Sequence, residues 1–232
     1  MTGHKATIAG ALAADSKKES VQSRLFHAVR KSILTGELKP GDSVSEIGLA
    51  RTQGVSQTTV REALVKLEHA GLVRRVPNVG TFVTQMTPRE IRERLRLRVM
   101  LEGLAGQEAA RLARAHHLAE IDRWLDAISR AVAANDYFEA AHADLELHRA
   151  IWRCSGDTTL YQMLDQLTVP LFAFVSMERQ RLREDLSAAV EAHDPIVQAI
   201  RAHDPTAAQE ALRLHIEKSY AEFLGAPLAQ QA

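Results

Sequence analysis

The sequence predicts a mainly α protein with two domains. In residues 19–86, three short helical patterns are followed by two β-prone runs around a turn. From Thr87 onward, long amphipathic segments show no strand-like alternation, which predicts an all-helical bundle. A chain of 232 residues, 46% of them hydrophobic, can fill both cores.

The first two predicted helices are short and sharply bounded. Residues 21–34 carry apolar side chains at helical spacing, and Gly36 is positioned to end the helix. Ser45 caps a second helix, and Gly54 forms the tight turn that leads into the third. Helices joined in this way are typical of a helix-turn-helix.

The third helix and the hairpin complete this domain. Ser56 is a good N-cap, apolar residues recur from Val60 to Leu67, and Gly71 supplies a left-handed stop. Residues 72–76 and 81–83 are β-prone, with turn residues between them. The order helix, helix, helix, hairpin predicts a winged helix-turn-helix that binds double-stranded DNA.

Polar side chains at the start of the third helix and in the hairpin suit base and phosphate contacts. The candidate DNA-binding residues are Ser56, Gln57, Thr58, Thr59, Arg61, Arg75, Asn78 and Gly80. Residues 1–86 contain 12 Lys and Arg against 7 Asp and Glu, so their net charge is +5, whereas the remainder carries −5. The basic half is therefore expected to face DNA. The alternative is a small helical domain with an ordinary polar surface.

The runs GELKPGDSVSEIGLA, VSQTTVREAL, LEHAGLV and NVGTFV resemble the winged-helix domain of the GntR superfamily of bacterial transcription regulators. The resemblance covers roughly 65 residues without a gap. Many members have Arg where this chain has Gln57, and that Arg commonly reads a guanine. Many also have Pro where Thr59 stands, whereas Arg61 keeps the usual pattern. The resemblance implies operator binding with an altered base preference.

The C-terminal domain, residues 87–228, is expected to contain six helices. Pro170 should kink the fourth, and Pro195 either starts the fifth or bends one that begins earlier. The expected starting points are Pro88, His117, Asn135, Asp157, Ser187 and Pro205.

Asp144 and His148 are four residues apart, so a helix places them on one face, where they can share an ion. An exposed Asp-His pair is the simpler interpretation of that spacing. His193 and His215 lie on later predicted helices that can converge on the third in a bundle core. His203 matches no ligand position and is expected at the surface.

The runs RLRVMLEGLAGQEAARLA, DLELHRAIWRCSG, EAHDPIVQAI and RLHIE resemble the FCD effector domain of FadR-type regulators, in its six-helix, VanR-like form. The resemblance implies a divalent metal ion, Zn²⁺ or Ni²⁺, held by Asp144, His148, His193 and His215. Arg98 matches a family arginine that can hold an effector carboxylate, and the alternative is a salt bridge with Glu102.

The resemblance implies a transcription repressor rather than an enzyme. We expect a homodimer on a near-palindromic operator, controlled by a small carboxylate metabolite at the metal site. A metal sensor, in which the ion itself is the effector, is the first alternative. A metal-dependent hydrolase is the second, although the sequence contains no HExxH motif.

The remaining features bound the cellular setting. The single cysteine, Cys154, excludes an intrachain disulfide and is expected to be buried. No long apolar run or signal peptide is present, so a cytoplasmic protein without membrane contact is expected. Residues 1–18 are expected to form a mobile arm.

Overall fold

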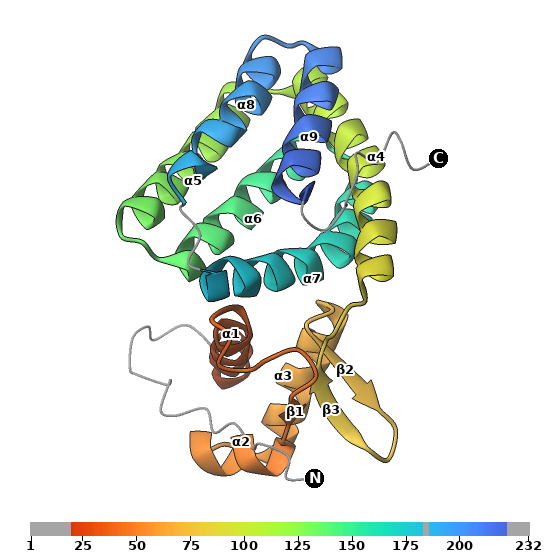
Figure 1. Cartoon of the computed structure of the whole chain (residues 1–232), viewed down its shortest axis with the longest axis vertical. Coiled ribbons are helices and arrows are strands. Elements are labelled where there is room, and N and C mark those ends of the chain that lie inside the picture. Colours follow the sequence, from red (N-terminus) through yellow and green to blue (C-terminus); the bar gives the residue numbers. More distant parts are fainter. Residues whose placement is uncertain (1–19, 183–185, 222–232) are drawn as a thin grey trace. The chain divides into compact units, whose positions relative to one another are not determined.

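The computed structural model describes residues 20–182 and 186–221 (Figure 1). The expected arm at residues 1–18 and the expected end of the second domain at residue 228 lie outside these ranges. The chain divides into two compact units, one up to Gln85 and one that begins at Met86, and the second half of α7, from Phe172, is grouped with the first. The mainly α class is confirmed.

The N-terminal unit contains three helices, each started by a serine whose hydroxyl accepts a backbone N–H of the first turn. The helices are α1 (Val21–Leu34), α2 (Glu46–Gln53) and α3 (Gln57–His69). Left-handed Gly54, at φ 63°, ends α2 and forms the turn into α3, as predicted. Apolar side chains of α1 and α3, among them Leu25, Val60 and Leu64, are fully buried in this unit.

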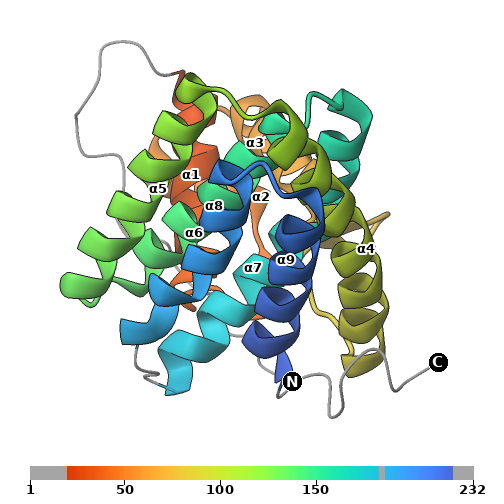
Figure 2. The same ribbon diagram turned by 90° about the horizontal axis from the view of Figure 1, so that it is seen from above.

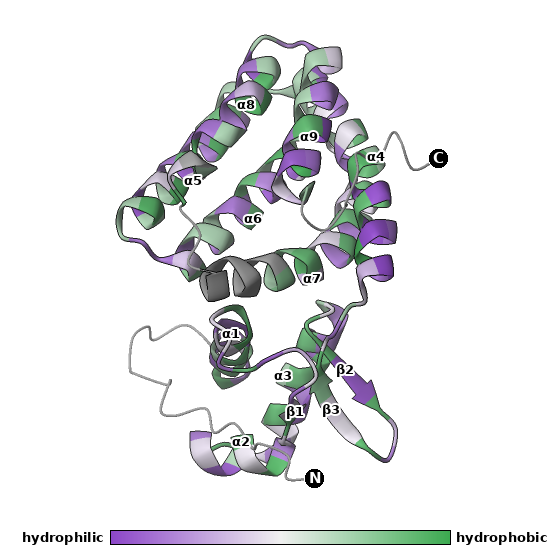
Figure 3. Cartoon of the chain, in the orientation of Figure 1, coloured by the Kyte–Doolittle hydropathy of each residue, from purple (hydrophilic) through white to green (hydrophobic). Residues whose placement is uncertain are grey.

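The wing is a three-stranded antiparallel sheet in the order β1-β3-β2. Its strands are β1 (Ser43–Val44), β2 (Val73–Val76) and β3 (Gly80–Val83). Strand β1 is absent from the sequence prediction because two residues are too few to show a pattern. Asn78, at φ 60°, turns the chain between β2 and β3, and the polar arginines colour β2 purple in Figure 3.

The second unit is an all-helical bundle. Its elements are α4 (Pro88–Leu112), α5 (Ala115–Ala133), α6 (Tyr137–Cys154), the first half of α7 (Thr158–Leu182), the 3-10 turns η1 (Ser187–Ala189) and η2 (Glu191–His193), α8 (Asp194–Arg201) and α9 (Pro205–Ser219). Of the two predicted alternatives for Pro195, the first is confirmed, because the segment from Ser187 forms only 3-10 turns and the α-helix begins at Asp194. Pro195 lies in the first turn of α8, where its missing N–H costs nothing, so it starts this helix. Pro170 lies inside α7, as expected.

Helix α6 runs through the bundle, with α5 and α4 packed along it, and α9 lies beside both α4 and α8 (Figures 1 and 2). Two α4 glycines allow the close approach of α9. A Cβ on Gly106 would overlap the Leu212 side chain, and one on Gly103 would lie 3.1 Å from Gln209 Cγ. No helix in the described ranges is long and apolar enough to cross a membrane.

Candidate functional site

Helix α6 supplies two of the four predicted metal ligands, Asp144 and His148. Asp136 caps it by accepting the Glu139 N–H at 3.0 Å, and its apolar face, including Leu147 and Ile151, is fully buried. The anchored helix therefore fixes the positions of Asp144 and His148, one turn apart. His148 is fully buried, and the Asp144 side chain is 18% exposed.

The other two ligand candidates come from the end of η2 and from α9. His193 precedes α8, and its Nδ1 lies 2.8 Å from the Ala189 carbonyl. His215 Nδ1 lies 3.2 Å from the Ala192 carbonyl. A carbonyl oxygen only accepts, so each Nδ1 carries a proton and donates it. Backbone geometry thus fixes the tautomer of both rings.

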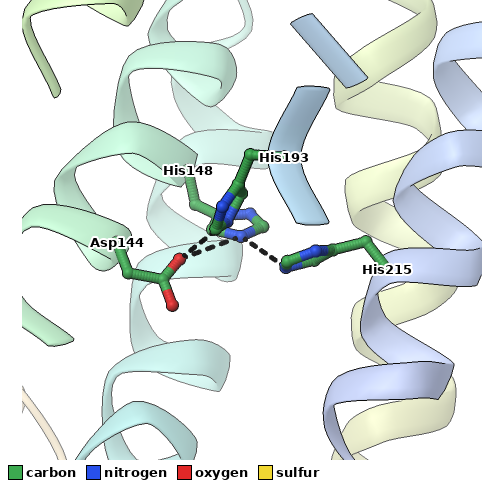
Figure 4. Close-up of side chains that lie close together, drawn as sticks. All are labelled: Asp144, His148, His193 and His215. Atoms are coloured by element: carbon green, nitrogen blue, oxygen red, sulfur yellow. Dashed lines mark hydrogen bonds and ion pairs between the residues drawn. The ribbon is translucent and has the colours of Figure 1, made fainter. Parts of the chain in front are cut away.

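Four donor atoms meet in the space between α6, η2 and α9 (Figure 4). His148 Nε2 lies 3.3 Å from His215 Nε2, and Asp144 Oδ1 lies 3.0 Å from His193 Nε2 and 3.5 Å from His148 Nε2. All four atoms lie within 4.8 Å of one another. Ligand atoms on opposite sides of one ion, with bonds of about 2.0–2.2 Å, are separated by up to about 4.4 Å. The spacing of the four atoms is therefore close to that of ligands around one ion.

The tautomers explain why a cation fits these residues. His148 Nδ1 lies 2.6 Å from Glu102 Oε2, so it too carries a proton when the ring is neutral. Each Nε2 then points a lone pair at the same space as the Asp144 carboxylate. Lone pairs that face one another repel, and a metal ion relieves this repulsion. Three imidazole nitrogens and one carboxylate oxygen form a donor set suited to Zn²⁺ or Ni²⁺.

The pKa shifts suit Asp144 and His215 as donors, whereas they favour a proton on His193 Nε2, which lies 3.0 Å from the Asp144 carboxylate. Burial raises the pKa of Asp144, but His193 and His148 lower it by more, to well below its usual range. Burial lowers the pKa of His193, and the Asp144 carboxylate raises it above the ordinary value. Burial and the charges of His193 and His148 hold the pKa of His215 far below its usual range. Asp144 is therefore an anion and His215 a neutral imidazole, and an ion that binds here must displace the Nε2 proton of His193.

Behind His148 lies a buried polar chain that the sequence analysis missed in part. Arg98 Nε donates to Glu102 Oε1 at 2.5 Å, and Arg98 Nη1 donates to the Tyr220 hydroxyl at 2.8 Å. Burial raises the pKa of Glu102, but the Arg98 guanidinium and the His148 ring hold it well below its usual range. The Arg98-Glu102 spacing signals their pairing, but no sequence signal indicates Tyr220 or the contact between Glu102 and His148.

The other histidines lie outside this cluster. His203 is exposed, and its Nδ1 donates to the Ala110 carbonyl at 2.8 Å. The rings of His116 and His117 contact each other, with centroids 3.9 Å apart. His142 lies against Trp124, with ring centroids 6.0 Å apart. The metal-ligand group in the described ranges comprises only the four predicted residues.

The predicted DNA contacts lie at the start of α3 and on the wing. Gln57, Thr58 and Arg61 are exposed near the N-terminus of α3. Ser56 Oγ is committed to the helix cap, and it lies 2.9 Å from the Thr59 hydroxyl. Both hydroxyls therefore shape the helix start as well as facing solvent. On the wing, exposed residues surround the turn, and they include the predicted Asn78 and Gly80.

Arg61 and Arg75 are paired within this unit. Both guanidinium groups approach the carboxylate of Glu46, from α3 and from β2 respectively. The Arg75 backbone N–H donates to Glu68 Oε1 at 3.2 Å, which ties the wing to the end of α3. Helix α3 and the wing thus share Glu46 as a side-chain partner.

Comparison with known proteins identifies both domains. The family of bacterial regulatory proteins named gntR matches residues 21–83, and the FCD domain matches residues 93–218. The chain belongs to the GntR family. A relative of this GntR protein from Paenarthrobacter nicotinovorans, described as a "Probable D-xylose utilization operon transcriptional repressor", is 31% identical over 199 residues, 86% of this chain and 87% of that protein.

Further GntR relatives support the regulator assignment. The gluconate operon transcriptional repressor of Bacillus subtilis is 24% identical over 191 residues, 81% of this chain and 78% of that protein. Among solved structures, Escherichia coli McbR/YncC has the same fold, with a TM-score of 0.75 and 23% identity over 92% of this chain and 99% of that chain. These proteins and families are transcription regulators, so the hydrolase alternative is excluded.

Proposed function

We propose that this GntR-family regulator is a repressor whose operator affinity is set by a small organic acid bound at a metal centre in the FCD domain. The observation that carries the proposal is the convergence of the Asp144 carboxylate with three Nε2 atoms whose rings are fixed from behind. A divalent ion held there would supply open coordination positions for a carboxylate.

The local charges favour an acid as the effector. The carboxylates of Asp144 and Glu102 and the guanidinium of Arg98 together carry one negative charge. A divalent ion changes this balance to one positive charge, which a monocarboxylate neutralises. Because the guanidinium of Arg98 is engaged by Glu102 and Tyr220, its first role is to hold Glu102 against His148. Exchange of the Tyr220 contact would free Nη1 for an effector.

The indole N–H of Trp152 supports an effector that carries hydroxyl groups. Trp152 is fully buried one turn after His148 on α6, and its indole N–H has no hydrogen-bond partner among the described residues. A buried indole N–H normally has an acceptor. The centroids of the indole and His148 rings are 6.3 Å apart, so this donor lies close to the proposed metal centre. Since one relative is named for a gluconate operon, we favour a hydroxy or sugar acid.

We infer that the regulator acts as a homodimer through α4. One winged helix contacts a half-site, so a specific complex needs two. Helix α4 presents an apolar stripe at helical spacing, with Leu97 51% exposed, Met100 69% and Leu104 44%. Such a stripe on a long helix suits a second copy of the same helix.

Helix α4 also connects the effector site to the DNA-binding unit. It begins at Pro88, five residues after the wing strand β3 ends, and it carries Arg98 and Glu102. An acid that shifts this pair changes how α4 packs, and thereby the placement of the paired winged helices. A coupling of about 1–3 kcal/mol changes operator affinity by about 5- to 150-fold.

Metal content and acid binding test the proposal together. Elemental analysis of purified protein should give about one divalent ion per chain, and the His148→Ala, His193→Ala variant should lose it. A thermal-shift screen of hydroxy and sugar acids, including D-gluconate, should then give acid-specific shifts only for the metal-loaded wild type. Absence of metal from both proteins would show that the four residues do not form a metal centre.

Operator binding separates an acid effector from the metal-sensor alternative. If the ion itself is the effector, titrating it should change operator affinity without any acid. If the centre is a platform for an acid, the metal-loaded protein should respond to the acid at constant metal concentration.

A further inference from the structure

The carboxylate of Glu46 lies between two arginines from different elements of the winged helix. Glu46 Oε2 accepts from Arg61 Nη2 at 3.1 Å and from Arg61 Nε at 3.3 Å. Glu46 Oε1 lies 3.7 Å from Arg75 Nη2. The first residue of α2 therefore holds a guanidinium of α3 and one of β2 through a single side chain.

This cluster lies on the face expected to meet DNA. A shallow groove there is lined by Glu46, Gln57 and Arg61 on the helices and by Val79 and Gly80 on the wing. Phosphates favour arginines on such a face, but they repel a carboxylate. A carboxylate at this position is thus unfavourable for DNA binding, unless it serves to hold the two arginines in place.

Fold stability does not account for these contacts. The Arg61 side chain is 56% exposed, Arg75 36% and Glu46 23%. Ion pairs this exposed contribute little to stability, because water screens them. The ion pairs have a greater effect on the net charge of this surface and on how freely the two guanidinium groups move.

We propose that Glu46 is a positioning residue that restrains Arg61 and Arg75 and lowers the affinity of the regulator for DNA that lacks the operator. With Glu46 in place, the three groups carry one positive charge instead of two. The two nitrogens of Arg61 that bind the carboxylate, Nε and Nη2, reach a phosphate or a base only when they leave it. Matched base contacts, such as a guanidinium on guanine, offset this loss on an operator, whereas phosphates alone do not.

The test uses the full-length protein and a labelled 30-base-pair duplex of random sequence, with binding followed by fluorescence anisotropy at several NaCl concentrations. Glu46→Gln should tighten binding to this duplex about two- to fivefold at low salt. The slope of log affinity against log salt should steepen by about one. Circular dichroism melting checks that each variant is folded.

Glu62→Gln is the matched control, because it removes the same charge from an exposed residue next to Arg61. Among the described residues, Glu62 forms no ion pair. Its effect on binding to the random duplex should be clearly smaller than that of Glu46→Gln. Equal effects would show that Glu46 acts only through its surface charge, which would overturn the proposal.

A double-mutant comparison tests whether Glu46 acts through the arginines. In an Arg61→Ala, Arg75→Ala background, adding Glu46→Gln should steepen the salt dependence and tighten binding no more than Glu62→Gln does. A gain that persists in this background would contradict the positioning role. A purely structural role would instead lower the melting temperature without the gain in DNA affinity.

Discussion

Glu102 and His148 form a buried pair on the far side of the proposed metal centre. Glu102 Oε2 lies 2.6 Å from His148 Nδ1, and both side chains are fully buried. The opposite ring nitrogen, Nε2, lies 3.3 Å from His215 Nε2. By holding the proton on Nδ1, Glu102 turns the Nε2 lone pair toward the other ligands and makes the ring a stronger donor.

This pairing predicts that Glu102→Gln weakens metal binding although Glu102 is not a ligand. The amide is a poorer acceptor for His148, and it leaves the buried Arg98 charge without its carboxylate partner. We expect a loss of about 10- to 100-fold in Zn²⁺ affinity. We also expect a destabilisation of about 3–5 kcal/mol from the broken buried pair. Competition with a chelator and denaturant unfolding measure the two effects.

Glu108→Gln is the control for Glu102→Gln. Glu108 lies on the same helix, but its carboxylate pairs with Arg111 near the surface, 34% exposed. It should change neither quantity appreciably, because exposed ion pairs contribute little. Unchanged Zn²⁺ affinity in a folded Glu102→Gln protein would show that Glu102 does not orient His148.

Most of the fold follows from local signals. Ser45 and Ser56 as caps, Gly36, Gly54 and Gly71 as left-handed stops, and Pro205 at the start of the last helix all occupy their predicted places. Such signals act within one turn of chain, so they can be recognised without knowledge of packing. The sequence left two starts open for the fifth helix, near Ser187 and at Pro195, and the proline is the better signal because α8 begins at Asp194.

The candidate site could be predicted only in part. Asp144 and His148 share a helix, so their spacing is informative, but their convergence with His193 and His215 rested on a family resemblance. The contact between Arg98 and Tyr220 spans 122 residues, and the contacts of Glu46 with Arg61 and Arg75 join three different elements. Such contacts depend on tertiary packing, which residue spacing does not encode.

The apolar stripe of α4 predicts that Met100→Glu with Leu104→Glu weakens the proposed homodimer. Two carboxylates on each facing helix would repel each other and oppose burial. We expect a monomer by light scattering at micromolar concentration, and operator binding weaker by at least tenfold because two half-sites are no longer held together. Leu214→Glu is the control, since Leu214 is an apolar residue of α9 that is 51% exposed. A dimer that survives the double change would place the interface elsewhere.

Cys154 should resist alkylation in the folded protein. Its side chain is buried, its thiol donates to the Ala109 carbonyl at 3.5 Å, and burial raises its pKa to about 11. The reactive thiolate is therefore scarce at pH 8. Because the folded pKa lies above the ordinary value, the thiol contributes stability below about pH 9, and this contribution is lost as the pH rises through about 11.

Iodoacetamide labelling followed by mass spectrometry measures the reactivity of Cys154. Labelling should be slow at pH 8 in native protein and fast in guanidinium chloride. Equal rates in both conditions would mean that the thiol is accessible and ionised as in an unfolded chain.

The exposed start of α3 predicts that Gln57→Arg changes the operator base preference. Gln57 and Arg61 are one turn apart, so they lie on one face of the helix. An arginine at position 57 can form two hydrogen bonds with guanine, which discriminates against other bases by about 1–3 kcal/mol. Selection from a random duplex library should show a shift toward guanine at one position of each half-site. Gln57→Lys adds the same charge without the planar fork, so it should tighten binding more uniformly across sequences. If Gln57→Arg selects the same sequences as the wild type, residue 57 does not contact bases, and recognition must rest on Thr58, Arg61 and the wing.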